Sequence, residues 1–369
     1  MNPGRQTGKR QDRRAVAFLA VGTVAGFLLA ASGNTRLVRL RSEYRLDAAD
    51  PLENAPPVVA FTTVVLGGFR GLIADVLWLR AARMQEEGRF FELVQLADWI
   101  TKLEPRSTET WGFHAWNMAY NVSIMMSDDS ERWRWVHNGI ELLARDGLRY
   151  NPADPQLYFE LGWLFQHKIG GHTDSRHRYY KQRWAEEMTK LLGSSHPDFD
   201  DLAAETVRRD RMTREYGLSP ERMREVDDKY GPLDWRMPET HAVYWAHLGQ
   251  QVESYLPCAR MIYQSLAVLF MRGRLTRDAT TGIVVAAPNP EILPAVLAAY
   301  EAALRDYPVK SVRESYAAFL HMAVQLLDKM ERDEDARRVF HRLHRVFPSQ
   351  DTAAGYEVFV RRAKEGLPE

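Results

Sequence analysis

The sequence has almost no cysteine and no excess of charge of either sign. Cys258 is the single cysteine in 369 residues, so neither an intramolecular disulfide nor a multi-cysteine metal site can form. Lysine plus arginine and aspartate plus glutamate number 49 each, whereas nucleic-acid-binding domains usually carry a basic excess. We therefore expect no nucleic-acid partner. The chain is long enough to bury a core without cross-links.

Sequence motifs of common catalytic sites are also missing. The chain contains no phosphate-binding glycine loop, no nucleophile elbow and no zinc-protease helix motif. Its two glycine pairs, at 67–68 and 170–171, are simple breaks between helical patterns. We predict that the protein is not an enzyme and needs no cofactor.

The longest uncharged apolar run lies near the amino terminus. Residues 15–32 read AVAFLAVGTVAGFLLAAS, and a helix of that length spans roughly 27 Å at about 1.5 Å per residue, enough for a bilayer core. The alternatives are a signal peptide cleaved after its small residues and a helix buried in a soluble domain. The predicted segments are a basic cytoplasmic tail at 1–14, a transmembrane helix at 15–33 and a linker at 34–57.

Basic residues flank this run on both sides, so the charge asymmetry that orients a membrane helix is weak. Acidic residues dilute the second basic cluster, although they count for little in the rule. We predict a single-pass protein of the cell membrane, with the short tail inside and the large domain extracytoplasmic, in the periplasm of a bacterial-type envelope.

A second apolar stretch covers residues 58–79, and Arg70 and Asp75 interrupt it. Charges at mid-membrane depth cost a few kcal/mol each on insertion scales. We predict a buried or membrane-surface helix that leads into the first helical unit. A second membrane span remains the alternative.

From Ala74 onward the sequence shows helical spacing broken by Gly, Pro and Asn. Strand-like alternation appears only at 274–287, where we expect a short hairpin or an extended loop. Helical units are expected at 74–105, with Gly88 at the turn between two helices, at 109–152 and at 317–348.

Two further units carry a sharper pattern. Residues 158–165 combine aromatic residues with Leu161 and Gly162 in an aromatic-x-x-Leu-Gly-x-x-aromatic order, and residues 245–249 repeat its centre with Gly249. A glycine at this position lets a partner helix approach closely, while the large residues on either side fill the seam.

These units resemble tetratricopeptide (TPR) repeats, in which each unit of about 34 residues forms a hairpin of two antiparallel helices. The resemblance implies an all-α fold, an irregular TPR-like α-solenoid, and a groove that binds protein partners. Unit lengths are irregular, and a charged stretch divides the array. The expected parts are TPR-like repeats at 58–193, a charged helical insertion at 194–240 and TPR-like repeats at 241–369.

Candidate partner-binding residues come from aromatic and amide side chains. Asn117 and Asn121 lie four residues apart and so share a helix face, beside two aromatic residues. Trp235 sits in the insertion, where it either pins the loop to the core or forms part of a binding element. The predicted partner-binding residues are Trp116, Asn117, Tyr120, Asn121, Tyr158 and Trp235.

Histidines suggest a different kind of site. His167, His172 and His177 lie within one short segment near Asp174, and imidazole and carboxylate groups bind zinc or copper. A spacing of five turns each ring about 140° from the last on one helix, so a shared site requires a break at the glycine pair 170–171. The leading hypothesis is a membrane-anchored scaffold of an envelope assembly or export complex, and the alternative is a metal-binding or enzymatic protein that uses these histidines.

Overall fold

Helices make up nearly all of the regular structure in the computed structural model of this protein, which describes residue 36, residues 70–277 and residues 284–365. The predicted all-α class is thereby confirmed. The predicted transmembrane helix at 15–33 and residues 58–69 of the second apolar stretch lie outside the described residues. Among the residues that are described, no helix is both long and apolar enough to cross a bilayer.

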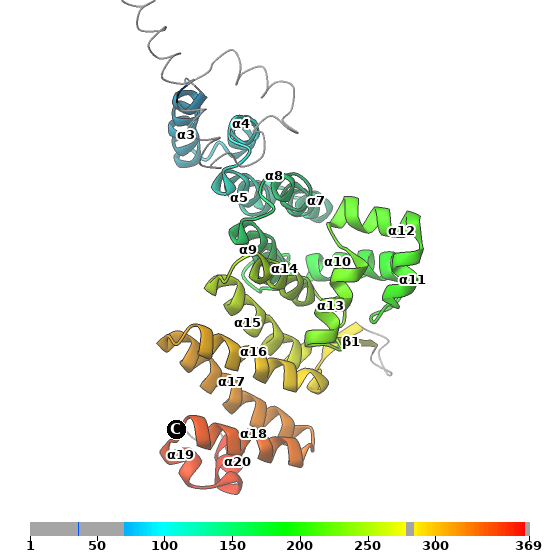
Figure 1. Ribbon diagram of the computed structural model, residues 1–369, viewed down its shortest axis with the longest axis vertical. Coiled ribbons are helices and arrows are strands. Elements are labelled where there is room, and N and C mark those ends of the chain that lie inside the picture. Colours follow the sequence, from blue (N-terminus) through cyan, green and yellow to red (C-terminus); the bar gives the residue numbers. More distant parts are fainter. Residues whose placement is uncertain (1–35, 37–69, 278–283, 366–369) are drawn as a thin grey trace, which may run out of the picture. The chain divides into compact units, whose positions relative to one another are not determined.

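The described helices follow one another from residue 70 to residue 365 (Figure 1). In chain order the α-helices are α3 (Arg70–Glu86), α4 (Phe90–Leu103), α5 (Thr108–Trp116), α6 (Ser123–Met125), α7 (Asp129–Glu141), α8 (Leu148–Tyr150), α9 (Pro155–Trp163), α10 (His177–Leu192), α11 (Phe199–Ala204), α12 (Thr206–Arg211), α13 (Pro220–Tyr230), α14 (Pro238–Val252), α15 (Leu256–Arg272), α16 (Leu293–Asp306), α17 (Lys310–Lys329), α18 (Asp333–Val346), α19 (Gln350–Ala353) and α20 (Tyr356–Glu365). A short 3-10 helix, η6 (Pro290–Ile292), precedes α16.

Wider, π-helical turns continue several of these helices without a break. Such turns are rare and occur frequently at functional sites. They are η2 (Asn117–Val122) after α5, η3 (Leu142–Gly147) after α7, η4 (Leu164–Ile169) after α9 and η5 (Met212–Tyr216) after α12.

Helices α3 and α4 form the first pair, joined by the turn that the sequence predicts. Gly88 lies in this turn with a φ of +69°, a conformation that glycine adopts without strain. Leu93 and Ile100 of α4 form a small hydrophobic cluster with Ala81 and Met84 of α3. The burial of this apolar face stabilises the pair.

The two sharpest sequence motifs pack against each other, because α14 makes its most extensive contacts with α9 and α15. A Cβ atom at Gly162 of α9 would collide with Met261 Sδ. A Cβ atom at Gly249 of α14 would lie 2.8 Å from Cys258 Sγ and 3.0 Å from Tyr158 Cβ. The two glycines therefore allow the close approach of neighbouring helices that the motif predicts.

Between α9 and α14 the chain forms a segment of four α-helices, α10 to α13, before α14 packs back against α9. The intervening helices make lateral contacts: α10 with η4 and α14, η5 with α7 and η3, and α13 with α14 and α16. The sequence predicts charged surface helices for residues 194–240, and their outer faces are charged. Their inner side chains, among them Leu202, Met212 and Val226, nevertheless belong to the main hydrophobic core, so this segment is packed into the fold.

Of the two alternatives predicted for 274–287, a short hairpin or an extended loop, the structure shows paired strands. Strands β1 (Arg274–Arg277) and β2 (Val284–Ala287) pair antiparallel, with Arg274 opposite Ala287. These are the only strands among the described residues.

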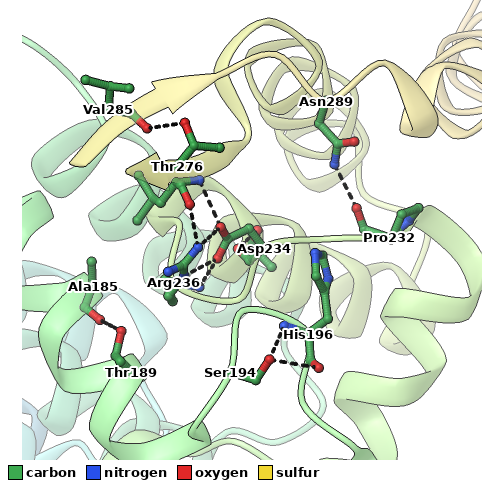
Figure 2. A network of polar contacts seen from close by, with 12 residues as sticks. Ala185, Thr189, Ser194, His196, Pro232, Asp234, Arg236, Thr276, Val285 and Asn289 are labelled. Carbon is green, nitrogen blue, oxygen red and sulfur yellow. Dashed lines mark hydrogen bonds and ion pairs between the residues drawn. The ribbon is translucent and has the colours of Figure 1, made fainter. Parts of the chain in front are cut away.

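An ion pair between the half-buried Arg236 and the buried Asp234 ties this hairpin to the turn that precedes α14 (Figure 2). Arg236 Nη2 lies 2.6 Å from Asp234 Oδ2 and also donates to the Leu275 carbonyl at 2.8 Å. The Leu275 N–H in turn donates to Asp234 Oδ2 at 3.0 Å. Asp234 is only 1% exposed, so its charge depends on these donors.

The carboxyl-terminal helices continue the pairwise packing, with α15 against α16, α17 against α18, and α19 against α20. Tyr300 of α16 stacks between Tyr263 of α15, at 4.4 Å between centroids, and Tyr316 of α17, at 5.0 Å. One hydrophobic core, from Trp111 to Val360, connects α5 with α20. Many helices packed in pairs are compatible with a helical-repeat fold.

The close approach at Gly249 predicts a loss of stability on a minimal substitution. Gly249→Ala should lower the free energy of unfolding by about 1–3 kcal/mol, because the new methyl group overpacks the contact with Tyr158 and Cys258. The control is Gly71→Ala in the first turn of α3, where nothing lies within 4 Å and helix propensity alone should stabilise by less than about 1 kcal/mol. Urea denaturation measures both, and an equal gain in the two variants would contradict the packing described.

Candidate functional site

A row of neighbouring aromatic rings lies at the surface where α9 contacts α5 and α15. Trp116 stacks on Tyr120 with centroids 5.5 Å apart, and Tyr120 lies 5.8 Å from His167. His167 stacks on Trp163 at 4.7 Å with an interplanar angle of 8°. We call the whole row the aromatic strip, and its members, all at least partly exposed, are Trp116, Tyr120, His167, Trp163, Phe159 and Tyr255.

Helical spacing explains how the strip forms from two helices. Trp116 and Tyr120 are four residues apart, as are Phe159, Trp163 and His167, so each set lies along one helix face. Tyr120 lies in η2 and His167 in η4, and Tyr120 Oη is 3.0 Å from His167 Nδ1. This hydrogen bond joins the two π-helical turns and fixes both rings in the strip.

A buried ion pair lies beneath the strip. Lys168, in η4, is 2% exposed, and its ammonium donates to Asp174 Oδ2 at 2.5 Å. The same ammonium lies 5.0 Å from the ring centroid of Tyr120 and 5.6 Å from that of Tyr180. Burial raises the pKa of Asp174, but hydrogen bonds from Lys168 and the Arg176 N–H outweigh it, so the pKa lies below its usual value.

Glu160 places a carboxylate beside the rings. Its Cγ would be 3.4 Å from a Cβ at Gly112, so the Glu160 side chain lies against α5. Burial raises the pKa of Glu160, and its charge contributes to the raised pKa of Tyr120, of which burial is the larger cause. No hydrogen bond or ion pair to Glu160 is found within the described part of the chain. Phe159 and Trp163 lie beside it on α9.

The predicted asparagines do not both face outward. Asn117 is fully buried, and its amide donates to the Phe113 carbonyl at 2.8 Å. Asn121 is partly exposed and donates to Asn117 Oδ1 at 2.6 Å. Asn117 therefore supports the helix from within, and Asn121 is the amide that remains accessible beside Tyr120.

The other two predicted binding residues lie outside the strip. Trp235 is 0% exposed, and its indole N–H donates to Asp227 Oδ1 at 3.2 Å, so it pins the turn before α14 to the core. Of the two roles predicted for Trp235, the structure thus shows the one in which it anchors the loop to the core. Tyr158 is partly exposed, lies 6.4 Å from Trp245 and donates to the Pro152 carbonyl at 3.0 Å.

The three histidines of the predicted metal cluster separate into two places. His172 and His177 approach each other, with ring centroids 5.0 Å apart, whereas His167 belongs to the aromatic strip. His172 Nε2 is 2.7 Å from Arg272 Nη1, and a cation this close disfavours metal binding by that ring. Among the described residues, no group of three or more His, Cys, Asp or Glu side chains is placed to hold a metal ion.

A small cavity of about 130 Å³ lies near this histidine pair, between α10, α14 and the hairpin. Glu239 and Arg272 line it, 3.5 Å apart, together with Lys181. Burial raises the pKa of Glu239 and lowers that of Lys181 to about 8. Two larger hollows, of about 450 and 390 Å³, lie along α16 and share Ala298.

Three rings of the strip were missed from the sequence. Phe159 and Tyr255 carry no motif, and Trp163 lies inside the TPR-like pattern without being part of it. The spacing of 159, 163 and 167 is a signal that sequence inspection could use, since aromatic residues every four positions share one face. Which face points outward is decided by packing on α14.

Comparison with known proteins does not assign the chain to a family. The chain matches no protein-family model, and no curated protein matches it in sequence. Its class is therefore defined by the structure as an all-α protein of packed helix pairs with an exposed aromatic strip. The functional argument rests on the chemistry of this surface.

The ion pair beneath the strip predicts a strong effect of Asp174→Asn. The variant leaves the Lys168 ammonium buried without its counter-charge, so the free energy of unfolding at neutral pH should fall by about 3–5 kcal/mol. Because the folded-state pKa of Asp174 is lowered, its contribution is present above about pH 4 and is lost as pH falls through that pKa. Urea denaturation of the wild type and of Asp174→Asn from pH 7 to pH 2 should show that the difference between their free energies of unfolding shrinks at the acid end.

The matched control is Asp200→Asn, which breaks an exposed ion pair with Arg224. Exposed pairs contribute about 0–1 kcal/mol, so this variant should differ little from the wild type. Equal stabilities of Asp174→Asn and Asp200→Asn would show that the buried pair does not hold this region.

Proposed function

We propose that the protein is a membrane-tethered helical scaffold, without catalytic activity, that binds a segment of a partner protein along the aromatic strip. The observation that carries the proposal is the continuous contact of six partly exposed rings across α5, α9 and the start of α15. Isolated exposed apolar residues are normal on soluble proteins, whereas a contiguous row of large rings is typical of an interaction site.

Aromatic residues suit this role for energetic reasons. Trp and Tyr bury a large area, lose little conformational entropy on binding and dominate the affinity of many interfaces. In the strip each ring is already held by its neighbour, and Tyr120 and His167 are held by a hydrogen bond. A surface ordered in advance loses less entropy when a partner binds.

The TPR resemblance supports a scaffold. Helix pairs with glycine at their closest approach, as at Gly162 and Gly249, are what such repeats use to pack. We assign the array to a divergent TPR-like α-solenoid, with the α10–α13 segment inserted between α9 and α14. TPR-like arrays commonly bind protein segments, and no feature of the strip requires a metal or cofactor.

The membrane tether is proposed from the sequence and agrees with the exposed face of α3. Leu72, Val76 and Leu79 are 59%, 57% and 73% exposed and follow helical spacing, and the exposed Asp75 lies among them on the same face. Exposed apolar residues of this kind suit a membrane surface or a partner helix, as expected for the segment at 58–79. We place the repeats outside the cytoplasm, in an envelope assembly or export complex.

Replacing a central ring tests the binding surface. Trp116→Ala should weaken the complex between the full chain and its partner at least 30-fold, because hot-spot tryptophans contribute about 2 kcal/mol or more. The complex is isolated from native membranes in mild detergent, the partner is identified by mass spectrometry, and the affinity of each variant is then measured with purified components. Stability should change little, since Trp116 is 38% exposed.

Trp99→Ala is the matched control, because Trp99 is 51% exposed on α4 and is not part of the strip. It should bind like the wild type. Equal affinities of the Trp116→Ala and Trp99→Ala variants, or a full chain that stays free of partners under mild extraction, would refute the proposed surface.

Deleting residues 1–33 tests the tether. The full chain should stay with membranes after an alkaline wash, because the apolar run at 15–32 is long enough to cross a bilayer, and the deletion should release the protein. The intact mass should include residues 1–33. A mature chain that lacks them would identify the run as a cleaved signal peptide.

A further inference from the structure

We propose that the partner segment carries a lysine or arginine whose charged group binds the Glu160 carboxylate, with the rings of the aromatic strip around it. This inference rests on the proposed function, because it names the chemistry of the segment that the strip receives. It derives from the position of one carboxylate among aromatic rings.

Glu160 lies within the strip. Its neighbours on α9 are Phe159 and Trp163, whose ring centroids are 5.9 Å apart. Its side chain lies against Gly112 of α5, one helical turn before Trp116, where the absence of a Cβ leaves room for it. Its charge contributes to the raised pKa of Tyr120 and to that of Tyr255, of which burial is the larger cause in both. The carboxylate is therefore close to rings from each segment of the strip.

The Glu160 carboxylate has no neutralising cation within the part of the chain that the structure describes. Among the described residues Glu160 has no ion pair, and burial alone shifts its pKa, in the upward direction. The cation beneath the strip, Lys168, is 2% exposed and already bonded to Asp174. A half-buried carboxylate without a partner is destabilised by lost hydration. A cation from a partner should therefore bind more favourably here than at an exposed glutamate.

The surrounding charges and rings favour the same ligand. Glu109 is exposed on the same face of α5 as Gly112 and Trp116, three and seven residues before them, and adds a second negative charge. The faces of Trp and Tyr rings attract cations by about 0.5–2 kcal/mol. Lysine and arginine also carry long apolar stems that can lie along the rings. An acidic segment would be repelled.

Peptide sets with one fixed residue test this recognition. Terminally blocked decapeptides with random outer positions and a fixed central Lys, Arg, Gln or Glu form four immobilised sets, which are probed with the full chain in mild detergent. Wild type should bind the Lys and Arg sets about tenfold more than the Gln set, and the Glu set least. Glu160→Gln keeps the shape of the side chain and should bind all four sets about equally.

Glu314→Gln serves as the matched control, because Glu314 is an exposed carboxylate of α17 outside the strip and should leave the preference unchanged. Circular dichroism checks that each variant is folded. Equal binding of wild type to all four sets, abolished by Trp116→Ala, overturns the cation inference and leaves the strip as the binding surface. Binding to no set, or binding that Trp116→Ala does not weaken, overturns the proposed function as well.

Discussion

The close approach of α9 and α14 is the contact on which the candidate site depends. A Cβ atom at Gly162 would lie 3.3 Å from the Ala242 carbonyl of α14, and one at Gly249 would lie 3.0 Å from Tyr158 Cβ of α9. At both positions a Cβ would also come closer still to a side chain of α15, Met261 or Cys258. This contact sets which face of α9 is buried and which carries Phe159, Trp163 and His167. It also brings the chain back to the array after the α10–α13 segment, so the fold remains continuous although its sequence is interrupted.

A second interaction links the core to the surface. The Lys168–Asp174 pair lies directly beneath Tyr120, and the hydrogen bond from Tyr120 to His167 joins the π-helical turns of two helices. Charge, ring and hydrogen bond thus hold the strip in one arrangement before any partner arrives. Breaking this buried pair would leave an uncompensated charge, so rearrangements that separate Lys168 from Asp174 are costly.

Much of the helix content was predictable, because helical spacing and turn residues such as Gly88, between α3 and α4, depend on local sequence. The pairing of α9 with α14 was not, since a tertiary contact across an inserted segment leaves no periodic signal. The spacing of Asn117 and Asn121 identified one helix face correctly. It did not reveal that this face is split between the core and the surface, because that division follows from packing.

Hydrogen–deuterium exchange of the full chain, alone and in complex with the partner isolated from native membranes, tests the central claim most directly. Binding along the aromatic strip predicts slower exchange of backbone amides in α5 with η2 and in α9 with η4, and in the segment around Tyr255. Protection confined to the hollows along α16 or to the α10–α13 segment, with the strip unchanged, would contradict the account.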